Sequence, residues 1–319
     1  MRKVLVVVLF LTGIIGCKKT SNKIIDTSNI EVSVVVDRFE QKFYKADAQS
    51  LPALKNEYPY LFPEQTPDSV WLKKMQDSDE LYLLNKVDSV FPDFEDEKSE
   101  IEALFKNIKY YFPNFQEPKV LSLITKVDYE SKVIYADTLL LFSIDMYLGG
   151  SDDVYYDFPN YLSQNFSKER LTVDFGEAIL GSVFKKQNKR QFIEVIVQEG
   201  KLLYGLELFN SWKDAHLIIG YAKEELSWAE ANEEEIWKYF IENKLLYQNN
   251  PDLRNRFVNN APFSKFYLDI DKESPGKIGA WIGWQIVRSY MQNNNVPLHE
   301  LFDKSEVEIF ENSKYKPKR

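Results

Sequence analysis

The sequence predicts an α+β protein in which helices flank a small mixed β-sheet. Apolar residues recur at helical spacing before Pro113 and again after Ser167, and the segment between them consists of short apolar or alternating runs separated by polar turns. Hydrophobic residues make up 44% of the 319 residues, which places the chain outside the range of disordered proteins. No repeat of fixed period occurs, which disfavours a solenoid.

The amino terminus, MRKVLVVVLFLTGIIGC, has the pattern of a secretory signal: a basic start, an apolar run over residues 4–16 and a small residue before Cys17. The run is too short to span a bilayer, which takes about 20 apolar residues. IIGC resembles a bacterial lipobox, whose cysteine is lipidated and becomes the first residue of the mature protein. The alternative is a cleaved signal with an incidental cysteine.

Cys17 is the only cysteine in the chain, so its lipidation would leave no thiol for disulfides, thiol catalysis or zinc ligation. Acyl chains on Cys17 would anchor the protein to a membrane without a spanning helix. Residues 18–29, rich in Lys, Ser, Thr and Asn, are expected to form a flexible tether. We expect residues 30–319 to form a single globular domain.

The expected elements follow in chain order. Residues 30–36 have the β-branched content of a strand, residues 40–63 resemble helices broken at Pro52 and Pro59, and residues 68–113 carry apolar stripes at helical spacing. Three runs within residues 119–150 are expected to join the first strand in one sheet. Helices are then expected over residues 168–187, 190–209, 233–247, 274–294 and 297–303, with Ser274 as N-cap and Pro275 at the first helical position of the fourth.

The charge of the chain argues against nucleic-acid binding. The formal net charge is -9, and it would be -11 without Arg2 and Lys3 (-9 minus 2). An acidic surface repels phosphate backbones, and the chain has no basic stripe interleaved with aromatic residues. The terminal KYKPKR is short and is expected to be a solvated tail.

Histidine supply limits metal chemistry, because His216 and His299 are the only two in the chain. A metallopeptidase HExxH motif needs two histidines one helical turn apart, and this spacing is absent. We therefore expect no metal and no other cofactor. G-x-S-x-G, P-loop and dinucleotide motifs are absent as well.

Two stretches allow both a structural and a functional interpretation. Glu199 lies in the mostly apolar FIEVIVQEGKLLYG, where a buried carboxylate could have a raised pKa, as a structural group or in acid/base work. In SPGKIGAWIGWQIVRSYMQ, Gly279 and Gly283 each weaken a helix by about 1 kcal/mol relative to Ala. Two glycines one turn apart indicate close approach of another backbone or of a ligand.

As a set, SIDMYLGG, QEGKLLY, LIIGYAKEELSWAEANEEEIWKYFIENKLLY, APFSK, SPGKIGAWIGWQIVRSYM and SKYKP, with the lipoprotein start, resemble the gliding-motility lipoprotein GldB family of Bacteroidota. The resemblance covers most of the mature chain. It implies an envelope lipoprotein needed for gliding, a process linked to an adhesin-moving machine and to protein secretion.

The same segments resemble, more distantly, predicted zinc peptidases with HExxH on one helix, a downstream Glu-Gly pair and a P-G-x-x-G helix. Glu199 and Gly200 match the Glu-Gly pair, and Pro275, Gly276 and Gly279 match the later motif. The helix expected to carry HExxH, within residues 171–186, has no histidine. The resemblance implies a degenerate zincin-like architecture whose remnant cleft would include the residues Glu199, Gly200, Tyr204, Pro275, Gly276, Gly279, Gly283 and Trp284.

The leading hypothesis is a lipid-anchored, palmitate-bearing pseudoenzyme on a membrane facing the periplasm, which binds other gliding and secretion proteins of the envelope without catalysis. One alternative is a carboxylate-dependent hydrolase of envelope glycan or peptide. The other is a glycan- or lipid-binding module that uses the same cleft.

Overall fold

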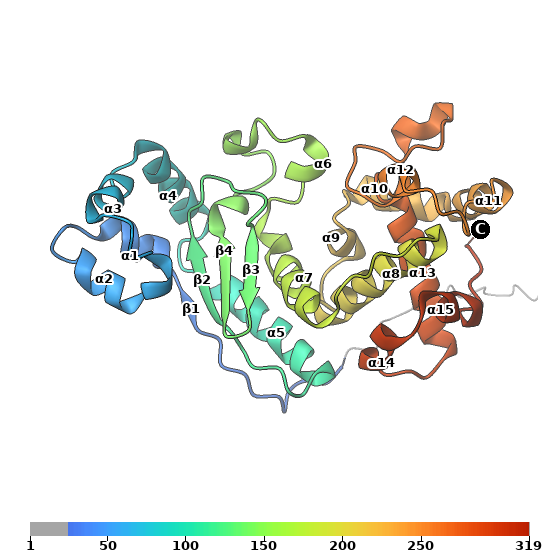
Figure 1. Ribbon diagram of the computed structural model, residues 1–319, viewed down its shortest axis with the longest axis horizontal. Coiled ribbons are helices and arrows are strands. Elements are labelled where there is room, and N and C mark those ends of the chain that lie inside the picture. The colour runs from blue at the N-terminus through green and yellow to red at the C-terminus, as the bar shows by residue number, and fades with distance from the viewer. Residues whose placement is uncertain (1–24, 319) are drawn as a thin grey trace, which may run out of the picture.

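The computed structural model describes residues 25–318, so the predicted signal peptide, Cys17 and the first part of the predicted tether lie outside the described residues. The α+β class is confirmed, because helices dominate and four short strands form one mixed sheet. In Figure 1, α1–α4 lie beside the sheet at one end of the molecule, α8–α15 form the other end, and α7 lies between them.

The strands are β1 (Val36–Asp37), β2 (Lys119–Leu123), β3 (Val133–Ala136) and β4 (Leu139–Ser143), in the order β1-β2-β4-β3. β1, β2 and β4 are parallel, and β3 is antiparallel to β4. The prediction of a strand over residues 30–36 is wrong except at its end, since pairing begins at Val36 opposite Val120. Earlier residues would lie beyond the start of β2, next to Pro118, which has no backbone N–H to donate.

Before β2 the chain forms α1 (Phe39–Lys45), α2 (Leu51–Glu57), α3 (Asp68–Lys74), α4 (Ser78–Val90) and α5 (Glu95–Tyr111). After β4 it forms α6 (Asn160–Ser163), α7 (Leu171–Val183), α8 (Phe192–Phe209), α9 (Ala215–Ile219), α10 (Lys223–Ala231), α11 (Glu233–Glu242), α12 (Asp252–Phe257), α13 (Ile278–Asn293), α14 (Leu298–Asp303) and α15 (Glu306–Asn312). The sequence analysis did not predict the short helices α6, α9, α10, α12 and α15.

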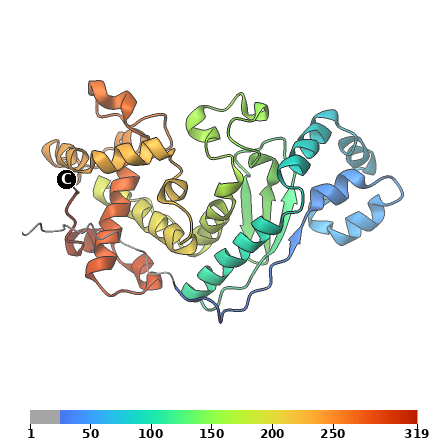
Figure 2. The same ribbon diagram turned by 180° about the vertical axis from the view of Figure 1, so that it is seen from behind.

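The two faces of the sheet belong to two hydrophobic clusters. Leu121 packs with Phe39, Phe43 and other apolar residues of α1–α3. Val120 and Phe142, which point to the opposite face because side chains alternate along a strand, join the main core with α5, α7 and α8. Figure 2 shows α5 running across this second face. The sheet therefore joins the N-terminal helices to the rest of the molecule.

The predicted start of the helix at Ser274 is wrong, because α13 begins at Ile278. The Ser274 hydroxyl lies 2.7 Å from the Asp271 carbonyl oxygen and 3.1 Å from the Ser264 carbonyl oxygen, so it closes the 3-10 turn Asp269–Glu273 and is not the N-cap of α13. Ser264 in turn donates through its hydroxyl to the Pro275 carbonyl at 2.7 Å. The loop contacts hold Ser274 and Pro275 outside the helix.

α13 and α8 form the most extensive contact between elements in the described part of the chain. A Cβ added to Gly200 would lie 2.2 Å from the Gly283 carbonyl oxygen, and one added to Gly283 would lie 1.7 Å from the Ile196 carbonyl oxygen. Only glycine allows two backbones to approach this closely. Gly200 and Gly283 thus mark the point where the two helices cross.

No helix within residues 25–318 is long and apolar enough to span a membrane.

Candidate functional site

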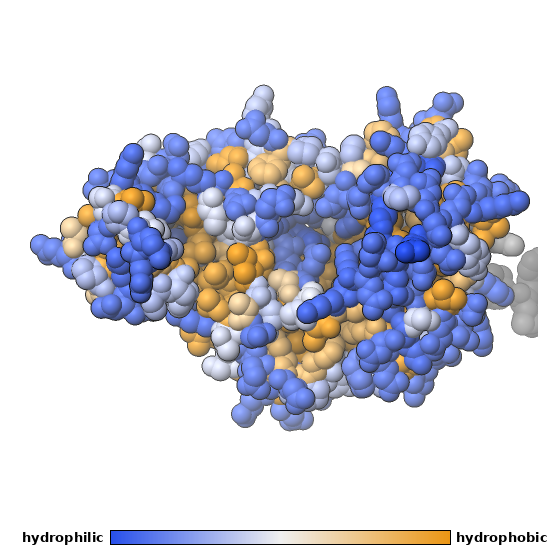
Figure 3. All heavy atoms as spheres, viewed as in Figure 1, coloured by the Kyte–Doolittle hydropathy of each residue, from blue (hydrophilic) through white to orange (hydrophobic). Residues whose placement is uncertain are grey.

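A polar pocket of about 420 Å³ opens beside the first half of α7. Figure 3 shows a recess between the sheet side and the helical side of the molecule, on a face where hydrophilic residues are frequent. The segments that line the pocket are the β2–β3 turn, α6 and the turn after it, the first turns of α7, the end of α9, the loop after α12 and the residue before α13. Its polar lining consists of Tyr129, Glu130, Lys132, Tyr161, Asn165, Arg170, Asp174, Glu177, Asn260 and Lys277.

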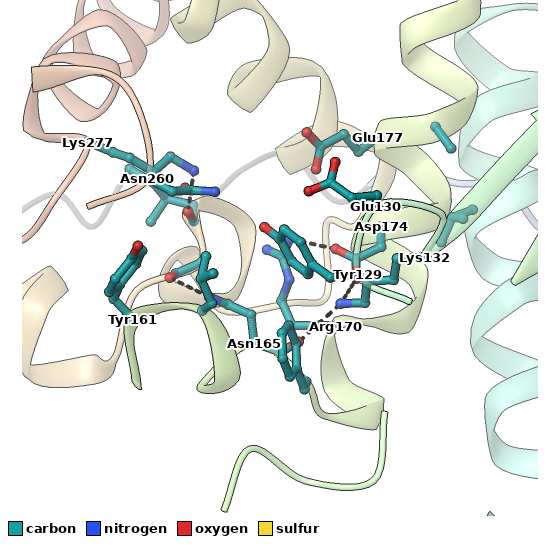
Figure 4. Close-up of a pocket in the computed structure, with 16 residues that line it drawn as sticks. Tyr129, Glu130, Lys132, Tyr161, Asn165, Arg170, Asp174, Glu177, Asn260 and Lys277 are labelled. Atoms are coloured by element: carbon teal, nitrogen blue, oxygen red, sulfur yellow. Dashed lines mark hydrogen bonds and ion pairs between the residues drawn. The ribbon is translucent and has the colours of Figure 1, made fainter. Parts of the chain in front are cut away.

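Asp174 is the centre of a charge network on one side of the pocket (Figure 4). Its carboxylate lies 2.6 Å from Lys132 Nζ and 2.6 Å from Arg170 Nη2, and it accepts a hydrogen bond from the Tyr147 hydroxyl at 3.1 Å. Arg170 and Asp174 are four residues apart, so consecutive helical turns place them on the same face. Two cations therefore share one carboxylate.

The network keeps Asp174 ionised. Burial alone would raise the pKa of Asp174, but the charges of Lys132 and Arg170 hold this pKa below its ordinary value. Burial lowers the pKa of Lys132, although Asp174 counteracts this shift. The cluster is consequently a fixed, charged wall of the pocket.

Arg170 connects this wall to the helical side of the molecule. Its Nη1 donates to the carbonyls of Leu217 and Ile218 in α9. Its Nε is buried and has no hydrogen-bond partner in the described structure. Buried donors are usually paired, so this unpaired atom leaves part of the guanidinium charge of Arg170 without an acceptor.

Lys277 supplies a third cation from the opposite side of the pocket. It occupies the left-handed backbone region, with φ 58°, immediately before α13. Its Nζ donates to the Ile219 carbonyl at 3.2 Å, and in the described part of the chain it has no ion pair within 4.0 Å. Burial lowers the pKa of Lys277, and Glu177, an exposed lining residue, partly counteracts this shift.

The β2–β3 turn is held in place by Asp145, whose side chain is fully buried. Asp145 accepts hydrogen bonds from the backbone N–H of Val127 at 2.7 Å and of Thr125 at 3.2 Å. Lys126 and Val127 both have positive φ, 59° and 55°, a conformation that is costly for a β-branched residue. The Asp145 carboxylate therefore stabilises the turn that leads to the pocket residues Tyr129 and Lys132.

None of the eight residues predicted for a remnant cleft is among the residues that line this pocket. Glu199 forms an ion pair with Lys186, 2.8 Å away. Gly200 and Gly283 lie at the crossing of α8 and α13, and Gly279 lies close to the backbone of Phe257. These glycines thus make helix contacts.

The remaining predicted residues also make defined contacts. The Trp284 indole is buried and donates to Glu207 at 2.8 Å, and Arg288 stacks over its ring. Burial raises the pKa of the half-buried Tyr204 to about 12. Pro275 and Gly276 belong to the turn before α13, where a Cβ on Gly276 would lie 2.2 Å from the Ala261 carbonyl oxygen.

The two histidines lie in different helices. His216 is in α9, where burial lowers its pKa, and His299 is exposed in α14. Within residues 25–318, no group of three or more His, Cys, Asp or Glu side chains is placed so that it could hold a metal ion.

Lys277, Arg170 and Asp174 are pocket residues that were not predicted from the sequence. Lys277 lies inside the quoted SPGKIG motif, where a lysine at the start of an apolar helix is unusual. Arg170 and Asp174 show the i, i+4 spacing of a helical ion pair. Neither signal by itself indicates that the three side chains meet at one pocket.

The fold and the site define a helix-rich α+β protein whose central pocket carries both signs of charge. The family described as gliding motility protein GldB matches residues 20–317, nearly the whole chain. The chain belongs to this family, and its involvement in gliding motility follows from that membership. Comparisons with curated proteins and with solved structures give no match.

Proposed function

We propose that this protein is a lipid-anchored component of the cell envelope that binds other gliding and secretion proteins without catalysis, on a fold related to zinc peptidases. Lipid on Cys17 would hold it on a membrane, facing the periplasm. The family supports the role in motility, and the lipobox-like IIGC supports the anchor.

The main support for the proposal that the protein is not an enzyme is the environment of Glu199. This residue matches the Glu of the Glu-Gly pair in the resemblance to peptidases, and its carboxylate is paired with Lys186 at 2.8 Å. The adjacent Gly200 packs against the backbone of α13. A carboxylate held by a surface lysine, next to a helix crossing, fits a structural role better than a metal ligand.

The side of α7 toward α8 supports the same interpretation. A Cβ added to Gly205 of α8 would lie 2.8 Å from the Leu180 side chain, and one added to Gly176 of α7 would lie 3.4 Å from the Leu206 side chain. A helix with HExxH presents both imidazoles on one face, toward the helix that carries the Glu-Gly pair, because all the ligands must reach a single ion. Here the Leu180 and Leu206 side chains and the Asn210 amide lie between the two helices.

Cys17→Ala is expected to release the protein from the membrane fraction, because no acyl chain can then be attached. The measurement is fractionation of cells that express the wild type or the variant, followed by immunoblotting. A variant that stays in the membrane fraction would contradict the proposed anchor. Ser21→Ala, in the predicted tether, is the control and should remain membrane-bound.

Glu199→Gln is expected to fold and to support gliding in a strain whose own copy is deleted. Lys186→Gln is the matched control, because it breaks the same ion pair and leaves the carboxylate intact. Each change should alter the free energy of unfolding by about 1 kcal/mol or less, as is typical of exposed ion pairs. Loss of gliding with folded Glu199→Gln alone would favour the hydrolase, and stoichiometric zinc in the purified wild type would contradict the non-catalytic proposal.

A further inference from the structure

The pocket beside α7 contains two cationic side chains, Lys277 and Arg170, whose hydrogen-bonding capacity is not fully satisfied within the described structure. Lys277 is bonded to a single backbone carbonyl and has no ion pair within 4.0 Å in the described structure. Arg170, which is 8% exposed, has an unpartnered Nε. The Lys277 ammonium group could donate further hydrogen bonds, and the unpaired donor of Arg170 costs free energy, so an anion near both residues would be stabilised.

The two features come from different elements and line the same pocket. Lys277 precedes α13, whereas Arg170 precedes α7. Figure 4 shows Lys277 and Asn260 on one side of the pocket and Arg170, Asp174 and Lys132 on the other. An anionic group between the two sides could accept a hydrogen bond from Lys277 and would lie near the charge of Arg170.

The other charges of the pocket restrict the kind of anion. The lining contains three cations, Lys132, Arg170 and Lys277, and three acids, Glu130, Asp174 and Glu177, so its formal charge is zero (3 minus 3). A doubly charged phosphate would be repelled by the acids, whereas a carboxylate carries one charge. Glu130 and Glu177 are exposed, where they could accept hydrogen bonds from hydroxyl or amide groups.

The neutral part of the lining also fits a polar organic ligand. Tyr129 and Tyr161 contribute aromatic rings, and Asn165 and Asn260 contribute amides. The volume of about 420 Å³ lies in the range of small-molecule sites.

We propose that this pocket binds a small polar ligand through its carboxylate, which would lie between Lys277 and Arg170. Two sources share this chemistry: a sugar acid, whose hydroxyls would meet Glu130 and Glu177, and the carboxyl terminus of a short peptide, whose amides would do so. The inference stands on the pocket alone and does not depend on the proposed function.

The test is calorimetric titration of the purified full-length protein with two matched pairs of probes. Glucuronic acid is compared with glucose, and Ala-Ala-Ala with the same peptide carrying a carboxyl-terminal amide. In one pair, the acid is expected to bind at least about tenfold more tightly than its neutral counterpart, since hydrogen bonds to charged groups are the stronger ones. The pair that shows this difference in affinity tells whether the ligand is a sugar acid or a peptide carboxyl terminus. Equal affinities of the acid and its neutral counterpart in both pairs, or no binding at all, would overturn the proposal.

Lys277→Gln is expected to weaken binding of the acid at least about tenfold. Lys272→Gln is the matched control, because Lys272 is exposed, does not line the pocket and carries the same charge five residues away. Unchanged affinity in a folded Lys277→Gln variant would overturn the proposal. If this variant does not fold, the wild type provides a second test: its affinity for the acid should fall as salt is added, because salt screens the attraction between charges. An affinity that does not change with salt would contradict binding through a carboxylate.

Discussion

Gly283→Ala is expected to lower the free energy of unfolding by at least about 3 kcal/mol, at the upper end of the cost of overpacking a core. The new Cβ would lie 1.7 Å from the Ile196 carbonyl oxygen. Because this oxygen belongs to the backbone of α8, no rotation of a side chain can relieve the clash, and the two helices must move apart. Urea unfolding monitored by circular dichroism measures the change.

Gly181→Ala is the matched control for this prediction. Gly181 lies in α7, and an added Cβ would have no neighbour within 4 Å. Alanine should therefore stabilise the protein by about 0.5–1 kcal/mol, the difference in helix propensity. Equal effects of the two substitutions would show that the crossing of α8 and α13 is looser than described.

Asp174→Asn is expected to lower the free energy of unfolding by about 3–5 kcal/mol, as is typical when one partner of a buried ion pair is removed. The substitution leaves Lys132 and Arg170 without the carboxylate that both contact at 2.6 Å. Thermal and urea unfolding of the two proteins at neutral pH measure the effect. A decrease in the free energy of unfolding below about 1 kcal/mol would show that water solvates these two cations well enough to replace the carboxylate.

The pH dependence of this difference has a defined sign. The pKa of Asp174 is lowered in the folded protein, so its carboxylate stabilises the fold above the ordinary pKa of about 4 and loses this effect as the pH falls through the lowered value. The difference between wild type and Asp174→Asn should therefore be full at neutral pH and shrink below about pH 4. A difference that grows on acidification would contradict the assigned charge state.

A double substitution separates charge from packing. Adding Lys132→Met to Asp174→Asn removes one of the two uncompensated cations and keeps an apolar stem near the Tyr147 ring, which Lys132 Nζ approaches to 4.4 Å. We expect the loss of the free energy of unfolding in the double variant to be smaller, by at least about 1 kcal/mol, than the sum of the losses in Asp174→Asn and Lys132→Met. Strict additivity would show that the Lys132–Asp174 pair contributes no coupling.

Much of the fold could be read from periodicity. The stripe of Ile101, Leu104, Phe105 and Ile108 predicts the buried face of α5, and all four side chains are in the core. The strands β2, β3 and β4 fall within the predicted region. Local pattern suffices here, because an amphipathic segment buries the same residues in any compact arrangement.

Boundaries set by contacts with distant residues could not be predicted. Ser274 and Pro275 have the residue types of a helix start, but hydrogen bonds to Ser264 and Asp271 hold them in a turn. Likewise, residues 30–36 have strand composition, yet of these only Val36 is paired with a residue of β2. A cap or a strand depends on which partner is within reach, and the tertiary structure decides this.

The same distinction between local pattern and tertiary contact applies to the candidate site. The sequence by itself determined the α+β class, the absence of an HExxH pair and the close approach expected at Gly279 and Gly283, because these depend on residue identity and spacing. Only the tertiary structure decided that Gly283 meets Gly200 at a helix crossing and that Lys132, Arg170 and Lys277 converge on one pocket. The physical reason is that these three lysine and arginine side chains come from segments far apart in the chain, and no local pattern encodes which of them the folded core brings together.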